Sequence, residues 1–98
     1  MWIKFEGKAP IEGTMKEAQL EGKEFLIGRN NGSFFCALNR CPHEDIKLTL
    51  GCIKNNRIKC SLHGYSFDID TGHSSDANVE NMQIFEIKQE DDDLFIKV

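Results

Sequence analysis

Long apolar runs, sustained helical periodicity and nucleotide-binding motifs are all missing from this 98-residue sequence. A membrane-spanning helix needs about 20 consecutive apolar residues, so we expect no association with a membrane. Residues 1–6 lack the apolar segment of a secretory signal, which leads us to expect a cytoplasmic protein. No flavin motif, nucleophile or acid–base constellation is present, and we therefore expect the chain to be no enzyme by itself.

Positive charge is also scarce, since 12 lysines and arginines stand against 16 aspartates and glutamates, for a net charge of −4. This balance argues against nucleic acid as a partner. It is compatible with docking onto a basic patch of another protein, and equally with a charge that only keeps a small protein soluble. We expect a monomer whose partners are proteins.

Repeats, low-complexity segments and linkers are absent, which indicates a single domain over residues 1–98. Turn residues separate short β-rich runs at roughly eight- to twelve-residue spacing. Strands are expected at 2–5, 14–20, 24–29, 33–38, 52–54, 57–59, 65–69, 82–88 and 94–98, with a short irregular or helical piece at 46–50, a loop at 73–81 and an acidic turn at 89–93. The continuous apolar run 25–27 favours strands covered on both faces. These features predict an all-β sandwich.

Two short Cys/His pairs occupy the middle of the chain. Cys41 and His43 form a C-x-H pair, Cys60 and His63 form a C-x-x-H pair, and sixteen residues separate the two. Four such groups could hold an iron–sulfur cluster in which one iron takes two sulfurs and the other takes two ring nitrogens.

Other roles for these cysteines and histidines are open. Two thiolates and two imidazoles can hold a structural zinc ion tetrahedrally, although zinc modules usually begin with a wider C-x₂₋₄-C pair. The remaining cysteines, Cys36 and Cys52, could form a disulfide, which a reducing compartment disfavours.

The two pairs occur together with glycines and a turn that carry a family resemblance: Gly51, Gly64 and the segment Phe67-Asp68…Thr71-Gly72. In this respect the chain resembles the Rieske-type [2Fe–2S] ferredoxins, the small soluble components of bacterial ring-hydroxylating dioxygenase systems. The resemblance implies one [2Fe–2S] cluster per chain, with Cys41 and Cys60 on one iron and His43 and His63 on the other. It also implies a Rieske-type antiparallel β-sandwich with a projecting cluster-binding subdomain at about residues 39–68.

The function implied by the resemblance is electron transport: a one-electron carrier between a flavin reductase and a terminal oxygenase. Two other functions are kept open. One is the small Rieske-like subunit of an assimilatory nitrite reductase, and the other is a zinc-stabilised interaction module. In each case the catalytic chemistry would lie in a partner, because the chain has no catalytic residues that we can identify.

Several positions depart from the high-potential members of the family. In those members a disulfide connects the two loops, and Ile46 and Leu62 stand here at the positions of its cysteines. Two hydroxyl-bearing side chains also point at the cluster in those members, and Tyr65 and Phe67 stand here at their positions. Fewer hydrogen bonds to sulfur lower the potential, so we expect a value of about −150 mV rather than +300 mV. The segment 74–79 has no proline, unlike the covering loop of most members.

The remaining polar residues near the two pairs have expected roles of their own. We expect Asp68 and Thr71 to hold a turn, and His73 to be an exposed residue rather than a ligand. Glu44 and Asp45 should lie near the docking tip and influence the rate of association with a partner.

Overall fold

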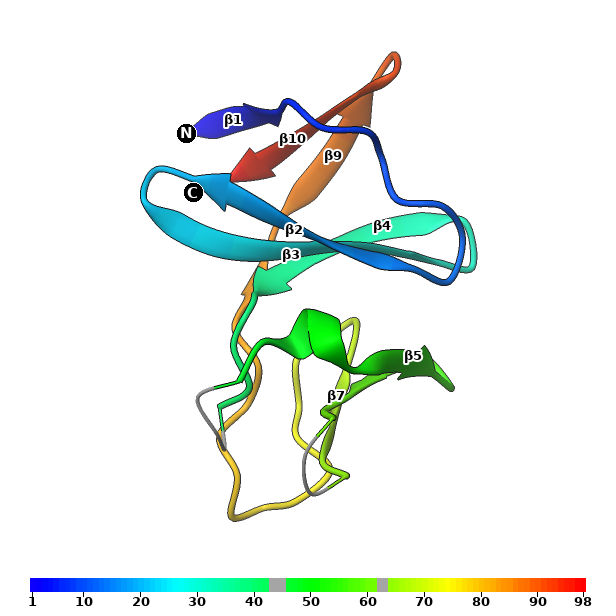
Figure 1. Cartoon of the computed structure of the whole chain (residues 1–98), viewed down its shortest axis with the longest axis vertical. Coiled ribbons are helices and arrows are strands. Elements are labelled where there is room, and N and C mark those ends of the chain that lie inside the picture. Colours follow the sequence, from blue (N-terminus) through cyan, green and yellow to red (C-terminus); the bar gives the residue numbers. More distant parts are fainter. Residues whose placement is uncertain (43–45, 62–63) are drawn as a thin grey trace.

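The computed structural model describes residues 1–42, 46–61 and 64–98. Three antiparallel sheets make up the molecule (Figure 1). The first sheet has the order β1 (Trp2–Phe5), β10 (Asp93–Lys97) and β9 (Ile87–Glu90). The second has the order β2 (Met15–Leu20), β3 (Lys23–Asn30), β4 (Ser33–Leu38) and β8 (Ile84–Phe85). The third contains β5 (Cys52–Lys54), β6 (Arg57–Lys59) and β7 (Ser66–Asp68), preceded by the 3₁₀ turn η1 (Leu48–Leu50).

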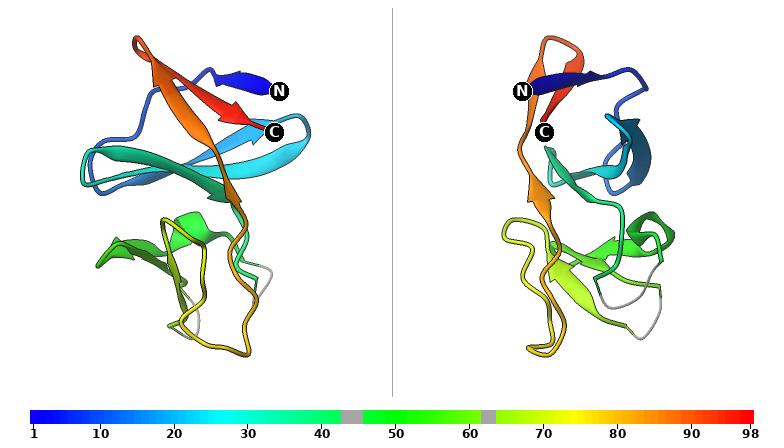
Figure 2. Two further views of the ribbon diagram at one scale, coloured as in Figure 1. Left: turned by 180° about the vertical axis from the view of Figure 1, so that it is seen from behind. Right: turned by 90° about the vertical axis from the view of Figure 1, so that its left-hand side faces the viewer.

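This architecture confirms the predicted all-β fold. The first two sheets stack into a sandwich, and the third sheet projects from it, as Figure 2 shows from two further sides. Both termini lie in the sandwich, where the N-terminal amine donates to the Val98 carbonyl at 3.1 Å. Within the described residues, no helix has the length and apolar character to cross a membrane.

One predicted strand was wrong in its extent. Residues 82–88 were expected to form a single strand, but the chain breaks at Glu86 into β8, which pairs with β4, and β9, which pairs with β10. The segment therefore passes from one sheet to the other at Glu86. The turn expected at 89–93 is also shorter, because pairing of Glu90 with Asp93 extends the hairpin.

The apolar run in β3 is buried from both sides, as the sequence predicted. Phe25 and Ile27 pack towards the first sheet, in one cluster with Leu94 and Ile96. Leu26 belongs to the other cluster, which contains the buried residues of the projecting half. Because successive side chains of a strand point to opposite faces, one face of the central sheet packs against the first sheet and the other packs against the projecting half.

The projecting half includes the segment 69–82, which runs alongside the third sheet (Figure 2). Val79 and Met82 are buried in the same cluster as Ile58 and Phe67. The proline-free part of this segment is held by hydrogen bonds: the Ser66 N–H donates to the Ser75 hydroxyl at 3.0 Å, and the Ser75 N–H donates to the Ser66 carbonyl at 2.8 Å. These two bonds attach the segment to β7 at Ser66.

Candidate metal centre

Cys41 and Cys60 come from separate loops but share one buried environment. They are 2% and 3% exposed and belong to the same cluster as Leu48, Ile58 and Phe67. The structure thus brings together the two cysteines predicted as ligands. The predicted ligands His43 and His63, together with Glu44, Asp45 and Leu62, lie outside the described residues.

The two cysteine loops are closed in the same way. The Cys41 N–H donates to the Ile46 carbonyl at 2.8 Å, and the Cys60 N–H donates to the Tyr65 carbonyl at 2.8 Å. In both cases the cysteine bonds to the residue five positions later, so each thiol stands at the base of a short closed loop. The histidine predicted to accompany each cysteine lies inside the loop that this hydrogen bond closes.

Two glycines allow the chain to approach itself around these loops. A Cβ atom at Gly51 would lie 1.9 Å from the Lys59 carbonyl oxygen, so only glycine permits this packing immediately before Cys60. Gly64 has a φ of +71°, in the left-handed region that favours glycine. The sequence drew attention to both glycines, and the structure gives each a backbone reason.

A polar network that the sequence did not reveal supports the first loop. Asn39 is 4% exposed, and its side-chain oxygen accepts the Thr49 N–H at 3.0 Å while its side-chain nitrogen donates to the Thr49 hydroxyl at 3.1 Å. Lys47 forms ion pairs with Glu17 at 2.8 Å and with Glu24 at 3.0 Å. These bonds connect both ends of the loop at 41–46 to strands β2 and β3. A polar residue in a loop usually faces solvent, so nothing in the pattern marked Asn39 as buried.

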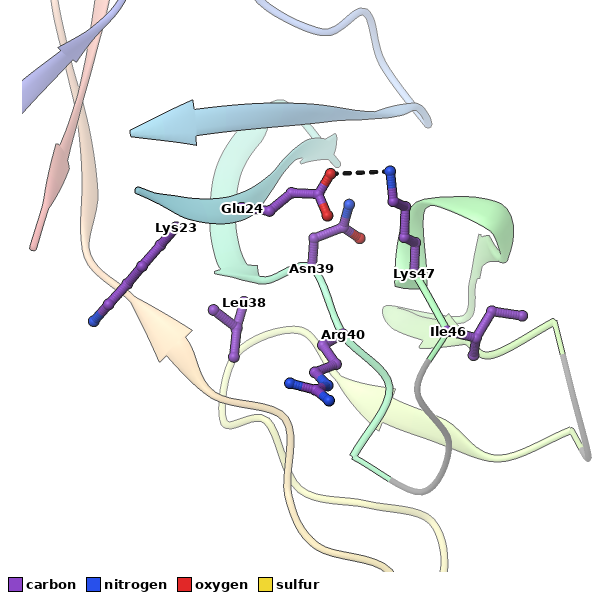
Figure 3. A pocket seen from close by; sticks show the side chains of 7 residues that line it. All are labelled: Lys23, Glu24, Leu38, Asn39, Arg40, Ile46 and Lys47. Atoms are coloured by element: carbon purple, nitrogen blue, oxygen red, sulfur yellow. Dashed lines mark ion pairs between the residues drawn. The ribbon is translucent and has the colours of Figure 1, made fainter. Parts of the chain in front are cut away.

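The same network borders an open groove of about 450 Å³ beside the first loop. Figure 3 shows Asn39 between the paired side chains of Glu24 and Lys47, with Arg40 on the neighbouring wall. The hydrogen bond from Lys47 lowers the pKa of Glu17, and the bonds to Glu17 and Glu24 raise the pKa of Lys47. Both shifts favour the charged forms, so the network remains ionic at neutral pH.

The turn after the second loop has the structural role predicted for it. The Asp68 carboxylate accepts the Asp70 N–H at 2.8 Å and the Thr71 N–H at 3.1 Å, and the Thr71 hydroxyl accepts the His73 N–H at 3.2 Å. The backbone hydrogen bonds from Thr71 and Asp70 hold the pKa of Asp68 below its usual value. His73 itself is exposed, as expected.

The remaining cysteines do not form the disulfide that was considered. None of the four cysteines, all of which lie in described segments, is in a disulfide. Cys36 is buried between the two sheets of the sandwich, and burial raises the pKa of its thiol to about 12. Cys52 is exposed on the third sheet.

The two described donors, the thiols of Cys41 and Cys60, fit a [2Fe–2S] cluster. Two buried, unbridged thiols at the ends of matching loops are the arrangement that one iron of such a cluster requires. Among the described residues, no three cysteine, histidine or acidic side chains gather as a metal site. The predicted ligands His43 and His63 are not among these residues.

The chain is similar to known proteins over most of its length. The model of the Rieske [2Fe–2S] domain family matches residues 1–88. The ferredoxin component of the naphthalene 1,2-dioxygenase system of Pseudomonas putida is 30% identical over 91 residues, covering 91% of this chain and 88% of the relative. Human apoptosis-inducing factor 3 is 29% identical over 86 residues, but the chain spans only 14% of that longer protein. Among solved structures, the ferredoxin of carbazole 1,9a-dioxygenase from Nocardioides aromaticivorans IC177 has the same fold, with a TM-score of 0.87 at 19% identity over 97% of this chain and 95% of that chain.

Proposed function

The chain belongs to the Rieske [2Fe–2S] domain family, and on that premise we propose that it is a ferredoxin that carries single electrons from a flavin reductase to a terminal oxygenase. The observation that carries the proposal is the pair of matching closed loops, each with a buried cysteine at its base. The naphthalene dioxygenase ferredoxin supports it further, since it is of nearly the same length and matches over most of it.

We propose that Cys41 and Cys60 hold one iron of the cluster and that His43 and His63 hold the other. The bound cluster supplies a one-electron couple at the protein surface. Around the cysteines, the apolar side chains of this half, Phe67 among them, exclude water from the thiolates. Neutral imidazoles add no charge, so this ligand set accepts an electron more readily than four thiolates would.

The extent of the domain and the location of the protein belong to the same proposal. We assign residues 1–98 to a single Rieske domain with a cluster-binding subdomain at about residues 39–68. We place the protein in the cytoplasm, where reducing conditions would keep Cys36 and Cys52 as thiols.

Paired variants test the ligand assignment. Protein produced with iron should show the visible absorption and the reduced-state electron paramagnetic resonance signal of a Rieske cluster. Cys60→Ser and His63→Ala should each remove or shift both signals, whereas the matched controls Cys52→Ser and His73→Ala should leave them unchanged. A colourless protein that contains zinc, or a normal spectrum in Cys60→Ser, would refute the assignment.

Reconstitution tests the role as a carrier. The purified chain is mixed with the reductase and the oxygenase of a naphthalene-type system, and NADH-driven product formation is measured as the chain concentration is varied. If the chain is a carrier, the rate of product formation should saturate as the chain is added, and the purified chain should elute alone from a size-exclusion column. Purification only as a fixed-ratio complex with a larger enzyme would instead identify a permanent subunit and would overturn the carrier proposal.

A further inference from the structure

The outer face of the third sheet carries an unusual concentration of positive charge. In this sheet Ile53, Ile58 and Phe67 point inwards, and the last two are fully buried. The alternate residues point outwards, and three of them are basic: Lys54, Arg57 and Lys59, which we call the basic face. The basic face lines a shallow depression of about 260 Å³ together with Asn55, Gly64 and Ser66.

Among the described residues, Lys54 and Lys59 have no acidic partner within 4.0 Å, and Arg57 has only the nearby Asp68. Among the described residues, the ion pairs within 4.0 Å involve other lysines: Lys4, Lys47, Lys88 and Lys97. Lys54 stands directly opposite Arg57 in the β5–β6 pairing. Like charges placed opposite one another destabilise a sheet, so the fold gains nothing from this arrangement.

One carboxylate does lie on the same side. Asp68 is paired with Arg57 across β6 and β7, and the charge of Arg57 helps to lower the pKa of Asp68. Its oxygen accepts the two backbone N–H groups of its own turn. The basic face therefore retains net positive charge on a protein whose overall charge is −4.

The position of the basic face connects it with electron transfer. Lys59 directly precedes Cys60, and a Cβ atom at Gly64 would lie 3.9 Å from the Lys59 side chain. The basic face thus begins at the edge of the second cysteine loop. A partner seated on it would stand beside the loop that holds one proposed ligand of each iron.

We propose that the basic face docks an acidic surface patch of a redox partner protein. The proposal rests on the proposed function as an electron carrier. Charge complementarity selects the partner. Lys54 and Lys59, which have no acidic partner among the described residues, attract carboxylates together with Arg57, while the net charge of −4 repels an extended polyanion such as nucleic acid. Opposite charges on the two proteins, close to the site from which the electron leaves, raise the rate of productive encounter more than they raise the final affinity of the complex.

Electron transfer from the dithionite-reduced protein to cytochrome b5, an acidic haem protein, tests this directly by stopped flow. Lys54→Glu/Lys59→Glu should slow the transfer about tenfold at low ionic strength, and the difference should disappear at high salt. The matched control is Lys8→Glu/Lys16→Glu, which makes the same change in net charge on the sandwich, where both lysines are exposed. The control should stay within about twofold of the wild type. With cytochrome c, a basic acceptor, the Lys54→Glu/Lys59→Glu variant should instead transfer electrons faster than the wild type at low ionic strength.

The possible outcomes distinguish a failure of the basic-face proposal from a failure of the proposed carrier function. Equal slowing by both double variants would show that only net charge matters and would overturn the proposal. If the glutamate variant does not load its cluster, Lys54→Gln/Lys59→Gln removes the charge without reversing it and should give a smaller slowing. No change in that variant would also overturn the proposal. A wild-type protein that takes up electrons but passes them to neither cytochrome would instead contradict the carrier function itself.

Discussion

Replacement of Asn39 by alanine should release the first cysteine loop and accelerate loss of the cluster. The Asn39 side chain bonds to the backbone N–H and the hydroxyl of Thr49, and its nitrogen lies 3.5 Å from a Glu17 oxygen. Since Asn39 precedes Cys41 by two residues and Thr49 follows Ile46 by three, these bonds tie the entrance of the loop to its exit.

The magnitude follows from the bonds that are lost. Alanine removes both bonds to Thr49 and leaves its N–H without its partner inside the protein. A net cost of about 1 kcal/mol for each of the two bonds gives roughly 2 kcal/mol for opening of the loop. At about 1.4 kcal/mol per factor of ten, the open state becomes roughly 30-fold more populated.

The assay follows the decay of visible absorbance in excess chelator at fixed temperature. The decay rate of Asn39→Ala should rise by about the same roughly 30-fold factor if the cluster is lost through the open loop. Thr49→Val keeps the backbone bond and loses only the hydroxyl, so its rate should rise less, by about fivefold. Asn78→Ala, at an exposed asparagine, serves as the control. A rate in Asn39→Ala within about twofold of the wild type would refute the reasoning.

Three further predictions follow from individual contacts. Gly51→Ala should prevent cluster loading, because its Cβ would collide with the Lys59 carbonyl oxygen, and a normal iron content would contradict this. Alkylation with iodoacetamide, followed by mass spectrometry, should label Cys52 rapidly and leave Cys36 unlabelled until unfolding, since burial raises the pKa of Cys36 to about 12; equal labelling would disprove the burial argument. Phe67→Tyr should raise the reduction potential measured by protein-film voltammetry from about −150 mV, because Phe67 is fully buried in the same hydrophobic cluster as Cys41 and Cys60, the proposed ligands; an unchanged potential would show that the added hydroxyl does not reach the sulfurs.

Local features of the chain could be predicted from the sequence because they depend on neighbouring residues. The strands at 2–5, 33–38, 52–54 and 57–59 have the predicted bounds, since turn residues delimit each of them. The same is true of the turn at Asp68, whose side chain bonds to the next few backbone groups. The two Cys/His pairs, together with Gly51, Gly64 and the turn at 67–72, predict the metal site, and the structure describes Cys41 and Cys60 of it.

Contacts between distant segments were decided only by the tertiary structure. The break at Glu86 depends on which sheet offers a free edge on each side of it, and that is a property of the assembled sandwich. Asn39 is buried because β2, η1 and the first loop converge on it, although its neighbours in sequence are those of a surface loop. Which face of the β5–β6 hairpin is exposed was decided in the same way, because Ile58 packs with Leu48 and Phe67 in the core and leaves Lys54, Arg57 and Lys59 on the outer side. Alternation along a strand indicates which side chains share a face, but only the assembled core shows which face is covered.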